Sequence, residues 1–306
     1  MPKRVLVIIS TYNGESYIAE QLDSIINQKC DASVSIVIRD DGSTDSTCAI
    51  VKSYINHFPG KIELIEGNNI GSNASYFYLI NHVNGFDYYA ISDQDDVWIE
   101  DKLQTAIEHI ESCTSEKAVL YASPSYIVYN DLVPHGMTRK QNIDMTFFNT
   151  IIQNICPGHN QVMNRHLLDI LKKTEVDPSK IYVFDSWISN VAMISGKIIF
   201  DNTPHAFYRQ HRGNQLGAGG NALSQFLFCI KRANKGDCKK QTKQIAYFAS
   251  VYQKELLDLG FWDEINRFIH ANGFFGRFAY IISSKLHRQK KYETVAFKIA
   301  YILGKY

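Results

Sequence analysis

The sequence lacks the features that mark membrane-spanning, secreted and fibrous proteins. No run reaches the ~18 apolar residues that a spanning helix needs. The apolar run after Lys3 and Arg4 stops at Ser10 and has no small-residue cleavage site. The 18 glycines and 7 prolines are too few for a collagenous or low-complexity chain, and the 6 cysteines are scattered, with no CxxC pair. We therefore expect a soluble, reduced, intracellular protein without a signal peptide and without disulfides.

Two common nucleotide-binding patterns are also absent. The chain contains neither a GxxxxGK[ST] phosphate loop nor a GxGxxG segment, which disfavours ATP-type and dinucleotide-binding proteins. Aromatic residues make up 12% of the chain, but they do not interleave with basic residues as they do in a nucleic-acid platform. We therefore expect no nucleic-acid partner.

What the chain does have is ordinary globular composition with an uneven charge. Hydrophobic residues make up 45% and charged residues 21%, which is enough for a packed core. Residues 1–220 hold 17 Lys+Arg against 25 Asp+Glu, or −8, whereas residues 221–306 hold 15 against 6, or +9. A basic tail on an acidic body indicates an anionic partner such as a membrane surface or a nucleic acid. A solvated helical surface explains the same count, and charge alone leaves these readings open.

Strands and helices alternate over the first 120 residues. Continuous β-branched runs are typical of strands buried on both faces of a parallel sheet. The pattern predicts strands at 4–9, 34–38, 62–65 and 86–92, with helices at 17–26, 50–55, 74–83 and 98–110. This alternation predicts an α/β fold with a mainly parallel sheet flanked by helices.

The pattern changes after Ser123. Residues 124–145 are expected to be irregular and residues 146–155 helical. Apolar residues then follow the 3.6-residue period over 245–256, 275–286 and 295–303. We expect one α/β domain over residues 1–220 and a helical, basic extension over residues 221–306.

Polar clusters follow three of the predicted strands. They are Ser10-Thr11-Tyr12-Asn13-Gly14, Asp40-Asp41-Gly42-Ser43-Thr44-Asp45 and Asp93-Gln94-Asp95-Asp96. Ligands of such sheets bind outside the carboxyl ends of the strands, so these clusters predict a binding site. The first could offer hydroxyls, an aromatic face and backbone donors to a nucleotide, and a carboxylate of the second could accept the imide N–H of uracil or thymine. An Asx-turn is the structural alternative for the second cluster.

The third cluster carries the strongest hint of metal chemistry. Asp93 and Asp95 form a DxD pattern, and crowded carboxylates of this kind are stabilised by a cation or by hydrogen-bond donors. Oxygen ligands suit Mg²⁺ or Mn²⁺, which bind through one or two carboxylates together with substrate phosphates. An acidic turn that caps the following helix is the alternative. A lone DxD does not decide between them.

The three clusters, in this order, resemble the inverting family 2 glycosyltransferases of the GT-A fold. The resemblance is closest to the rhamnosyltransferase-like branch that builds bacterial surface polysaccharides. Three later segments extend it: Gly158-His-Asn-Gln-Val-Met-Asn164 resembles the acceptor-side glycine segment, Phe184-Asp185-Ser186-Trp187 the His-Asp-x-Trp motif, and Tyr208-Arg209-Gln210-His211 the Tyr-Arg-Gln-His stretch. The matching motifs cover residues 5–217. The resemblance implies that the domain over residues 1–220 consists of a nucleotide-sugar half (1–123) and an acceptor half (124–220).

The resemblance implies a role for each matching residue. Asp185 falls on the catalytic base and Trp187 on the acceptor side. The implied metal ligands for Mn²⁺ or Mg²⁺ are Asp93, Asp95 and His211. The implied donor-binding residues are Ser10, Thr11, Tyr12, Asn13, Glu15, Asp41, Gly71, Asp93, Gln94, Asp95, Arg209 and His211. Two positions depart from the family pattern: Phe184 replaces a histidine, and Ser75 stands where a second asparagine is expected after Asn69-Ile70-Gly71.

The bond that is broken explains why such residues are needed. Loss of a nucleoside diphosphate leaves negative charge that a divalent ion and positive donors stabilise. The incoming hydroxyl needs a base on the opposite face, which one carboxylate provides. For Asp185 the alternative is a structural role, either in capping a helix or as a hydrogen-bond partner of Trp187. The run around His211 could equally be an exposed basic loop, or a loop that closes over the diphosphate on glycine hinges at 213, 217, 219 and 220.

Three functions compete at this stage. The first is a metal-dependent inverting transferase that moves rhamnose or a hexose from a dTDP- or UDP-sugar to a surface polysaccharide or lipid-linked glycan. The second is a degenerate relative that binds a nucleotide sugar or glycan without turnover. The third is a nucleic-acid binder that uses residues 221–306. If the chain is such a transferase, we expect residues 221–306 to dock on the inner face of the cytoplasmic membrane. The alternative is that they pack on the catalytic domain or on a second subunit of a homodimer.

Overall fold

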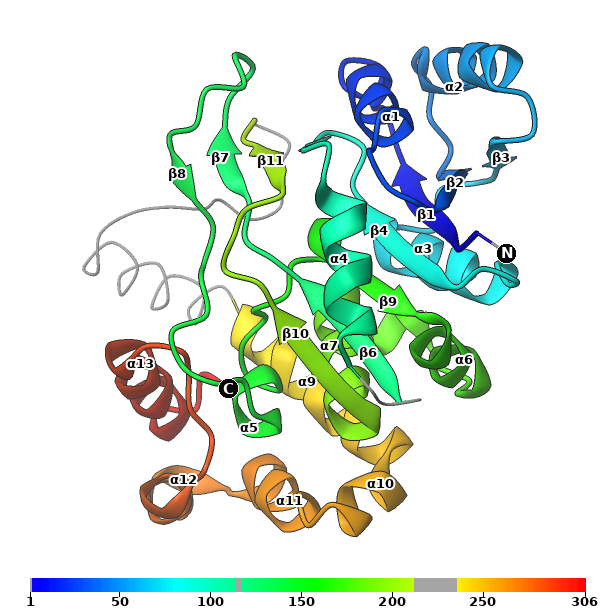
Figure 1. Ribbon diagram of the computed structural model, residues 1–306. Helices are drawn as coiled ribbons and strands as arrows, with labels where there is room; N and C mark the ends of the chain where they lie inside the picture. The colour runs from blue at the N-terminus through cyan, green and yellow to red at the C-terminus, as the bar shows by residue number, and fades with distance from the viewer. Residues whose placement is uncertain (1, 114–116, 212–235) are drawn as a thin grey trace. The chain divides into compact units, whose positions relative to one another are not determined.

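The computed structural model describes residues 2–113, 117–211 and 236–306 (Figure 1). The chain forms two compact units. The sheet unit comprises Met1–Lys140, Cys156–Glu175 and Ser195–Ala218, and the helical unit comprises Gln141–Ile155, Val176–Ile194 and Gly219–Tyr306. These units interleave along the sequence, whereas the predicted domains are consecutive. The predicted boundary between residues 220 and 221 lies outside the described residues. None of the five cysteines that the structure describes forms a disulfide.

A seven-stranded sheet forms the centre of the sheet unit. Its order is β10-β6-β9-β4-β1-β2-β3. The strands are β1 (Arg4–Thr11), β2 (Ser33–Asp40), β3 (Ile62–Glu66), β4 (Tyr88–Ser92), β6 (Ala118–Ala122), β9 (Val162–Asn164) and β10 (Gly196–Phe200). All neighbours are parallel except β9, which runs antiparallel to both β4 and β6. The predicted α/β fold with a mainly parallel sheet is confirmed, and β9 makes the sheet mixed.

The buried strand residues explain why helices cover both faces of this sheet. Val5, Val7 and Ile9 share a core with α1 (Ile18–Ile26), α2 (Thr47–His57) and α4 (Lys102–Glu111). The intervening Leu6 and Ile8 are also buried. Because side chains alternate along a strand, they face the opposite side of the sheet. There α3 (Ser72–His82) packs on β1 and β2, and α6 (Arg165–Lys173) packs on β4 and β6.

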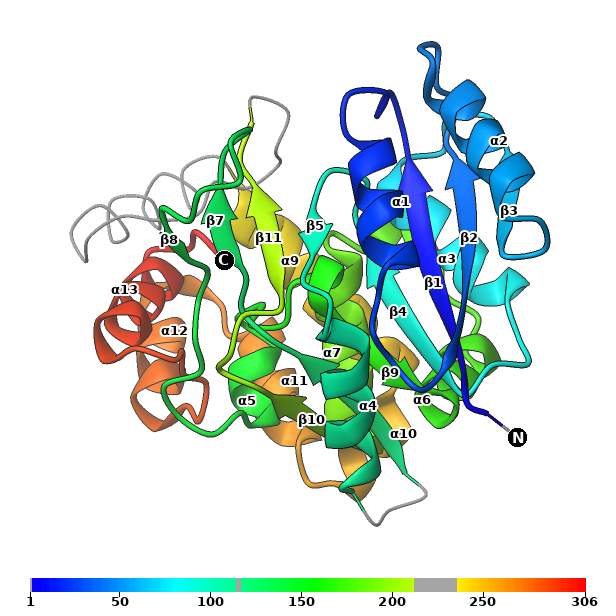
Figure 2. The same cartoon turned by 45° about the horizontal axis from the view of Figure 1, so that its top comes forward.

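The register of the parallel strands brings their polar ends together. Thr11 of β1 pairs with Asp40 of β2, and Ile9 of β1 pairs with Ser92 of β4. Figure 2 shows β1 and β2 side by side and pointing the same way. The three loops that follow these strands therefore leave the sheet at one edge.

A smaller sheet in the same unit has the order β5-β11-β7-β8. Its strands are β5 (Val97–Trp98), β7 (Tyr126–Val128), β8 (Gly136–Met137) and β11 (Ala206–Arg209). The prediction was wrong in two places here. Trp98 belongs to β5, where it pairs with Ala206, and α4 begins only at Lys102. The segment 124–145 is not wholly irregular, because β7 pairs with β8 and with β11. The sequence gives no local signal for either pairing, because the paired strands are distant in the sequence or only a few residues long.

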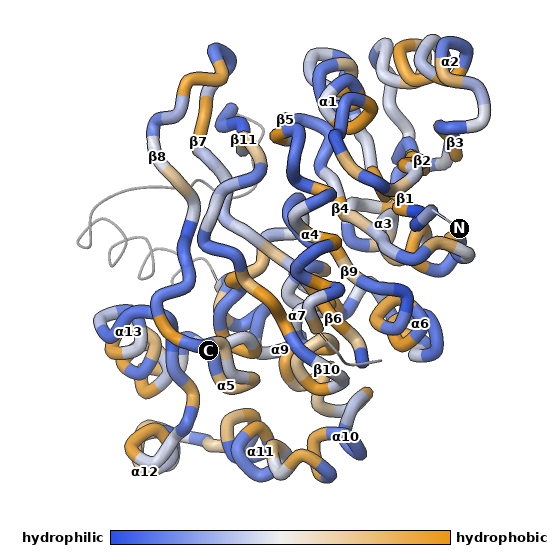
Figure 3. The backbone as a smooth tube through the Cα atoms, in the orientation of Figure 1, coloured by the Kyte–Doolittle hydropathy of each residue, from blue (hydrophilic) through white to orange (hydrophobic). Residues whose placement is uncertain are grey.

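The helical unit carries the described part of the C-terminal region. Its elements are α5 (Phe147–Thr150), the 3₁₀ turn η2 (Pro178–Lys180), α7 (Phe184–Ser195), α9 (Asp237–Val251), α10 (Gln253–Asp258), α11 (Trp262–His270), α12 (Gly273–Ser283) and α13 (Lys291–Ile302). Hydrophobic and hydrophilic residues alternate along α11, α12 and α13, as in helices with one buried face (Figure 3). The helix predicted over 146–155 is limited to one turn. The side chains of Asn149 and Gln153 form hydrogen bonds with residues 287, 289 and 293. The segment is thus held by bonds to a distant part of the chain and not by further helical turns.

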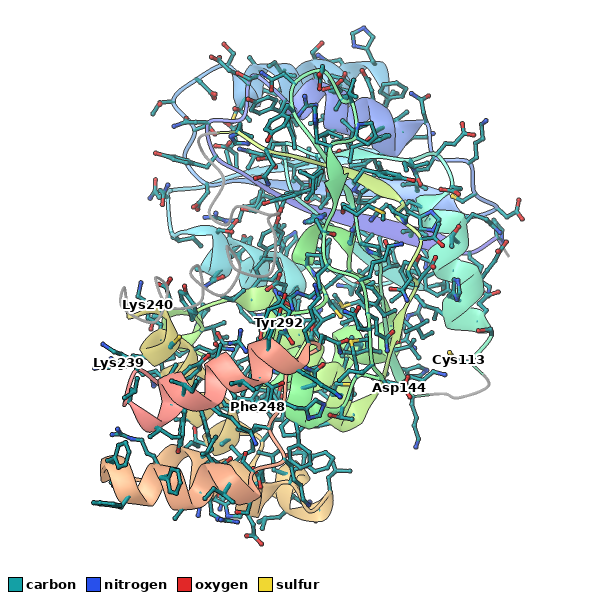
Figure 4. All side chains as sticks on the ribbon, turned by 90° about the vertical axis from the view of Figure 1, so that its left-hand side faces the viewer. Cys113, Asp144, Lys239, Lys240, Phe248 and Tyr292 are labelled. Carbon is teal, nitrogen blue, oxygen red and sulfur yellow. The ribbon has the colours of Figure 1, made fainter. Side chains whose placement is uncertain are left out.

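An aromatic core holds the helical unit together. Trp187 of α7 is fully buried against Tyr247 and Phe248 of α9 and against Tyr252, the residue that follows α9. Figure 4 shows Phe248 inside the helices, whereas Lys239 and Lys240 point outward. Burial of several large rings against one another is a major source of stability for such a small helical assembly.

Candidate active site

The loops after β1, β2 and β4 are bonded to one another through their polar side chains. The amide of Tyr12 donates to Oε1 of Gln94 at 2.9 Å, and Nε2 of Gln94 donates back to the Tyr12 carbonyl at 3.2 Å. The amide of Asn13 donates to Oγ of Ser43 at 2.8 Å. The structure therefore brings together three of the predicted donor-binding segments, and it leaves the Tyr12 ring 48% exposed beside them.

The remaining predicted residues of the first loop support this junction. Thr11 donates its hydroxyl to Oδ2 of Asp40 at 3.0 Å, and Ser10 donates to the Ser75 hydroxyl at 2.7 Å. Glu15 is exposed, and its carboxylate accepts the amide of Ser46 at 2.9 Å. The first loop is thus fixed to the loop after β2 at several points.

Asp40 stays ionised inside the junction. Burial acts to raise the pKa of its carboxyl, but hydrogen bonds from Ser43 and Thr11 outweigh this, and the pKa lies below its ordinary value. A carboxylate that accepts several donors in a fixed turn holds the loop after β2 in one conformation.

Asp41 lies beside it, buried, and has three donors around its carboxylate. Oδ1 accepts from the Arg39 guanidinium and from the amide of Ile70 at 2.8 Å, and Oδ2 accepts the amide of Gly71 at 2.9 Å. Gly71 has a φ of 86°, a conformation that favours glycine. A carboxylate offers about four acceptor positions, so one remains for a ligand. Arg39 is itself buried and also donates to Ser75, a supporting role that the sequence gave no reason to assign.

The DxD turn follows β4 and is held from two sides. The Tyr76 hydroxyl donates to Oδ1 of Asp93 at 2.9 Å. Nε2 of His211 lies 2.7 Å from Oδ2 of Asp95, and the imidazole stacks on Tyr17 with centroids 5.0 Å apart. Two of the three predicted metal ligands, Asp95 and His211, are therefore in direct contact, although 116 residues separate them in the sequence.

Arg209 is buried beneath this turn. Its Nε donates to the Asp95 carbonyl at 3.0 Å, its amide donates to Oδ1 of Asp96, and its guanidinium is paired with Glu20. The side chain also lies over the Tyr17 ring. In this arrangement Arg209 holds the DxD turn and the His211 segment in place, and its predicted contact with a donor stays a prediction. The following residues 212–220, with their predicted hinge glycines, lie outside the described residues.

A second polar cluster lies under the same turn. Nδ1 of His159 is 3.8 Å from Oδ2 of Asp96 and 3.9 Å from Oδ2 of Asp93. Within the described ranges, these three are the one group of three residues whose candidate ligand atoms lie within 4.8 Å of one another. Asp93 is thus grouped with Asp96 and His159 rather than with the predicted partners Asp95 and His211.

Burial governs the charge of this cluster. It raises the pKa of Asp96, together with the nearby charges of Asp95 and Asp93. It lowers the pKa of His159 to about 3, with the Lys102 charge adding to the effect, and lowers the pKa of Lys102 to about 7. Lys102 donates to Oδ1 of Asn160 and packs over the Trp98 ring. This cluster is an internal support for the DxD turn, and the sequence offered no signal for it.

The predicted base and acceptor residues lie on α7 in the helical unit. Asp185 is in the first turn, only 8% exposed, and Nδ2 of Asn154 donates to its Oδ2 at 2.8 Å. Trp187 offers no exposed surface, because its indole is enclosed by the rings of α9. This packing fixes the helix that carries Asp185, and the acceptor role of Trp187 stays a prediction.

Comparison with known proteins agrees with this geometry. Residues 6–171 match the model of the family described as Glycosyl transferase family 2. The chain is also 31% identical over 252 residues to dTDP-rhamnosyl transferase RfbG of Shigella flexneri, covering 77% of this chain and 82% of the relative. The chain belongs to glycosyl transferase family 2. The glycosyltransferase activity expected from the sequence motifs is thereby confirmed.

Solved structures show the fold of this family 2 glycosyltransferase. TarS of S. aureus, residues 1–349 in complex with UDP, aligns with a TM-score of 0.59 at 18% identity, covering 92% of this chain and 76% of that one. The mannosyltransferase PcManGT of Pyrobaculum calidifontis, in complex with GDP-Man and Mn²⁺, aligns with a TM-score of 0.54 at 20% identity, covering all of this chain and 88% of that one. The predicted GT-A type of fold is confirmed.

Proposed function

We propose that this family 2 glycosyltransferase is a metal-dependent inverting enzyme that transfers rhamnose or a hexose from a dTDP- or UDP-sugar. The acceptor is a growing surface polysaccharide or a lipid-linked glycan. The contact between Asp95 and His211, beside the joined loops after β1, β2 and β4, carries the proposal. The similarity to a dTDP-rhamnosyl transferase supports the donor class, as does the fold shared with a UDP-bound transferase.

The nucleotide half of the donor fits the joined loops. The exposed Tyr12 ring offers a face for a base or ribose, and Asp41 has one acceptor position left for the imide N–H of uracil or thymine. Ser10, Thr11, Asn13, Glu15, Gly71 and Gln94 shape the loops around them. The bonds between the loops hold them in place, which lowers the cost of ordering them around the nucleotide.

The donor set beside Asp95 fits a divalent ion. A carboxylate oxygen and an imidazole nitrogen meet at 2.7 Å in a part-exposed position, with Asp93 in the same turn. Oxygen and imidazole ligands suit Mn²⁺, and the oxygens alone suit Mg²⁺. Bound there, the ion would neutralise charge on the departing diphosphate. Asp95 and His211 would hold it, while Arg209 fixes the Asp95 backbone and Tyr17 supports the imidazole.

Asp185 is the proposed base for the acceptor hydroxyl. Its carboxylate lies at the N-terminus of α7, where the helix dipole favours its ionised form. An ionised carboxylate that takes the proton of the incoming hydroxyl needs no covalent enzyme intermediate, which gives inversion at the anomeric carbon.

The experiment that tests this function is a donor panel. The purified chain is incubated with dTDP-rhamnose, UDP-glucose, UDP-galactose, UDP-GlcNAc and GDP-mannose, with Mn²⁺, with Mg²⁺ or with EDTA. We expect release of the nucleoside diphosphate from one dTDP- or UDP-sugar, with loss of release in EDTA. Binding of a nucleotide sugar with no release under any metal would instead assign the chain as a degenerate binding protein.

We also propose that the C-terminal helices dock this enzyme on the inner face of the cytoplasmic membrane. Within the described ranges, no helix combines the length and apolarity needed to cross a bilayer. Large apolar residues are nevertheless exposed on α12 and α13: Phe274, Phe275, Phe278, Ile282, Val295, Ile299 and Leu303. Phe275 is 83% exposed and Ile282 67%. Tyr280 and Ile281 of α12 are buried, and Tyr280 bonds to Glu264 and contacts Phe268.

Five basic residues lie in the same stretch of the chain as this apolar face. Lys285 and Lys291 are exposed, while Arg288, Lys290 and Lys298 are half-buried. Each basic residue near an anionic leaflet contributes about 1 kcal/mol, and apolar side chains inserted among the headgroups add to this. Apolar rings beside lysines fit an anionic lipid surface, where a lipid-linked acceptor would lie.

Cosedimentation with liposomes checks this docking. We expect the wild-type chain to bind vesicles that contain anionic lipid, and the variant with Lys285, Arg288, Lys290, Lys291 and Lys298 changed to Gln to lose at least tenfold in partitioning. A matched control changes five exposed lysines of the sheet unit to Gln and should bind as the wild type: Lys29, Lys52, Lys61, Lys173 and Lys197. Equal binding with and without anionic lipid would contradict electrostatic docking, and a dimer that needs Phe275 would assign the face to a second subunit.

A further inference from the structure

The carboxylate of Asp185 is oriented by hydrogen bonds on both of its oxygens. Oδ1 accepts the amide of Ser186 at 2.7 Å, and Oδ2 accepts Nδ2 of Asn154 at 2.8 Å. The first donor belongs to the same helix as Asp185, so it does not fix the carboxylate relative to any other segment. The second comes from a segment 31 residues earlier and fixes the rotation of the carboxylate from outside the helix.

The backbone around Asn154 is anchored, although the residue itself is exposed. Gln153 and Ile155 on either side are buried. Gln153 accepts the amide of Gln289 at 2.7 Å and donates to the Glu293 carboxylate of α13 at 2.8 Å. Such a closed set of buried amide bonds is rigid. Asn154 therefore presents its amide from a fixed point.

The same core supports both partners of this hydrogen bond. Phe147 of α5 and Trp187 of α7 each pack against Phe248, with ring centroids 6.2 and 5.1 Å apart. The segment with Asn154 and the helix with Asp185 are thus held on one aromatic cluster within the helical unit. Their separation is set by packing rather than by the hydrogen bond alone.

We propose that Asn154 is a positioning residue for the reaction, holding the Asp185 carboxylate in the rotamer that receives the proton of the acceptor. The inference rests on the proposed function of Asp185 as the base. A carboxylate with one oxygen bound to a side-chain amide keeps its remaining lone pairs in a single direction. Without that amide, Oδ2 loses its side-chain donor while Oδ1 keeps the bond from Ser186, and the carboxylate spends less time in the orientation that aligns with an incoming hydroxyl.

Two variants of Asn154 separate orientation from shape. Asn154→Ala removes the donor and the side chain, whereas Asn154→Leu keeps nearly the same shape, removes the donor and adds no charge beside Asp185. Turnover is measured with dTDP-rhamnose and Mn²⁺, with water as the acceptor, or with the donor that the panel selects. We expect both variants to lower kcat by about 10-fold or more, as for loss of a hydrogen bond to a charged group. The donor KM should stay at the wild-type value, because the loops that fit the donor belong to the sheet unit. Asn84→Ala, an exposed loop asparagine of the sheet unit, is the matched control and should match the wild type.

The results distinguish the positioning role of Asn154 from the proposed role of Asp185 as the base. Wild-type kcat in both Asn154 variants, together with an inactive Asp185→Asn, would overturn the positioning role and leave the base in place. Wild-type kcat in Asn154→Leu alone would show that only the shape of the side chain matters, which also overturns it. Wild-type kcat in Asp185→Asn would remove the base assignment and the inference together. A parallel rise in donor KM would show that Asn154 acts on donor binding.

Discussion

Replacement of Asp185 by asparagine is expected to lower kcat by ~10²–10⁴-fold, the usual contribution of one general base. Asparagine has nearly the same shape but cannot take a proton at neutral pH. Its amide can still accept from the backbone of Ser186, so α7 keeps its start. Donor affinity should change little, because the loops that fit the nucleotide belong to the sheet unit and Asp185 to the helical unit.

The measurement combines turnover with calorimetric titration of the donor in the presence of Mn²⁺. Asp177→Asn is a suitable control, since Asp177 also begins a helical turn of the helical unit and accepts the amide of Ser179. This control should keep wild-type kcat. A collapse of donor affinity in Asp185→Asn would show that Asp185 binds the donor and that the base lies elsewhere.

Replacement of Asp95 by asparagine is expected to abolish metal-stimulated transfer while leaving the fold intact. The amide is a much weaker ligand for a divalent cation, and the pair with His211 loses its charge. The backbone of the turn should stay in place, because Arg209 bonds to the carbonyl of residue 95 and not to its side chain. Stability should therefore change by less than about 1 kcal/mol, as for most replacements outside a core.

Two measurements check the prediction for Asp95→Asn. Mn²⁺ binding, followed by electron paramagnetic resonance of the free ion, should weaken in Asp95→Asn and in His211→Ala. Nucleoside diphosphate release should lose its dependence on added metal. Asp23→Asn, an exposed aspartate of α1, should behave as the wild type. Near wild-type rates in Asp95→Asn would refute the assignment, and loss of Mn²⁺ binding in His159→Ala instead would move the ion to the cluster beneath the turn.

The deeper cluster explains why the metal ligands are better sought at Asp95. Asp96 and His159 are buried, and Lys102 lies close enough to affect the pKa of both. Asp95 and His211 are both part-exposed, so a diphosphate could reach an ion that they hold.

The sequence by itself determined the parallel strands of the N-terminal region and the meeting of the polar segments that follow them. The runs 4–9, 34–38 and 86–92 are apolar enough to be buried on both faces, and this requires parallel strands whose carboxyl ends meet. The polar residues that follow them had to lie at one edge, as the pairing of Thr11 with Asp40 and of Ile9 with Ser92 shows. These features are local in sequence, so pattern and spacing were sufficient to find them.

Only the tertiary structure decided which distant residues meet. His211 reaches Asp95 because β11 pairs with β5, and Asn154 reaches Asp185 because the segment around it is tied to α13. Burial likewise separated residues that look alike in the sequence: Trp187 and Tyr280 are enclosed, whereas Phe275 is exposed. The physical reason is the same in each case. Pairing and packing partners far apart in the chain leave no periodicity, and the free energy that selects them comes from apolar burial over the whole unit.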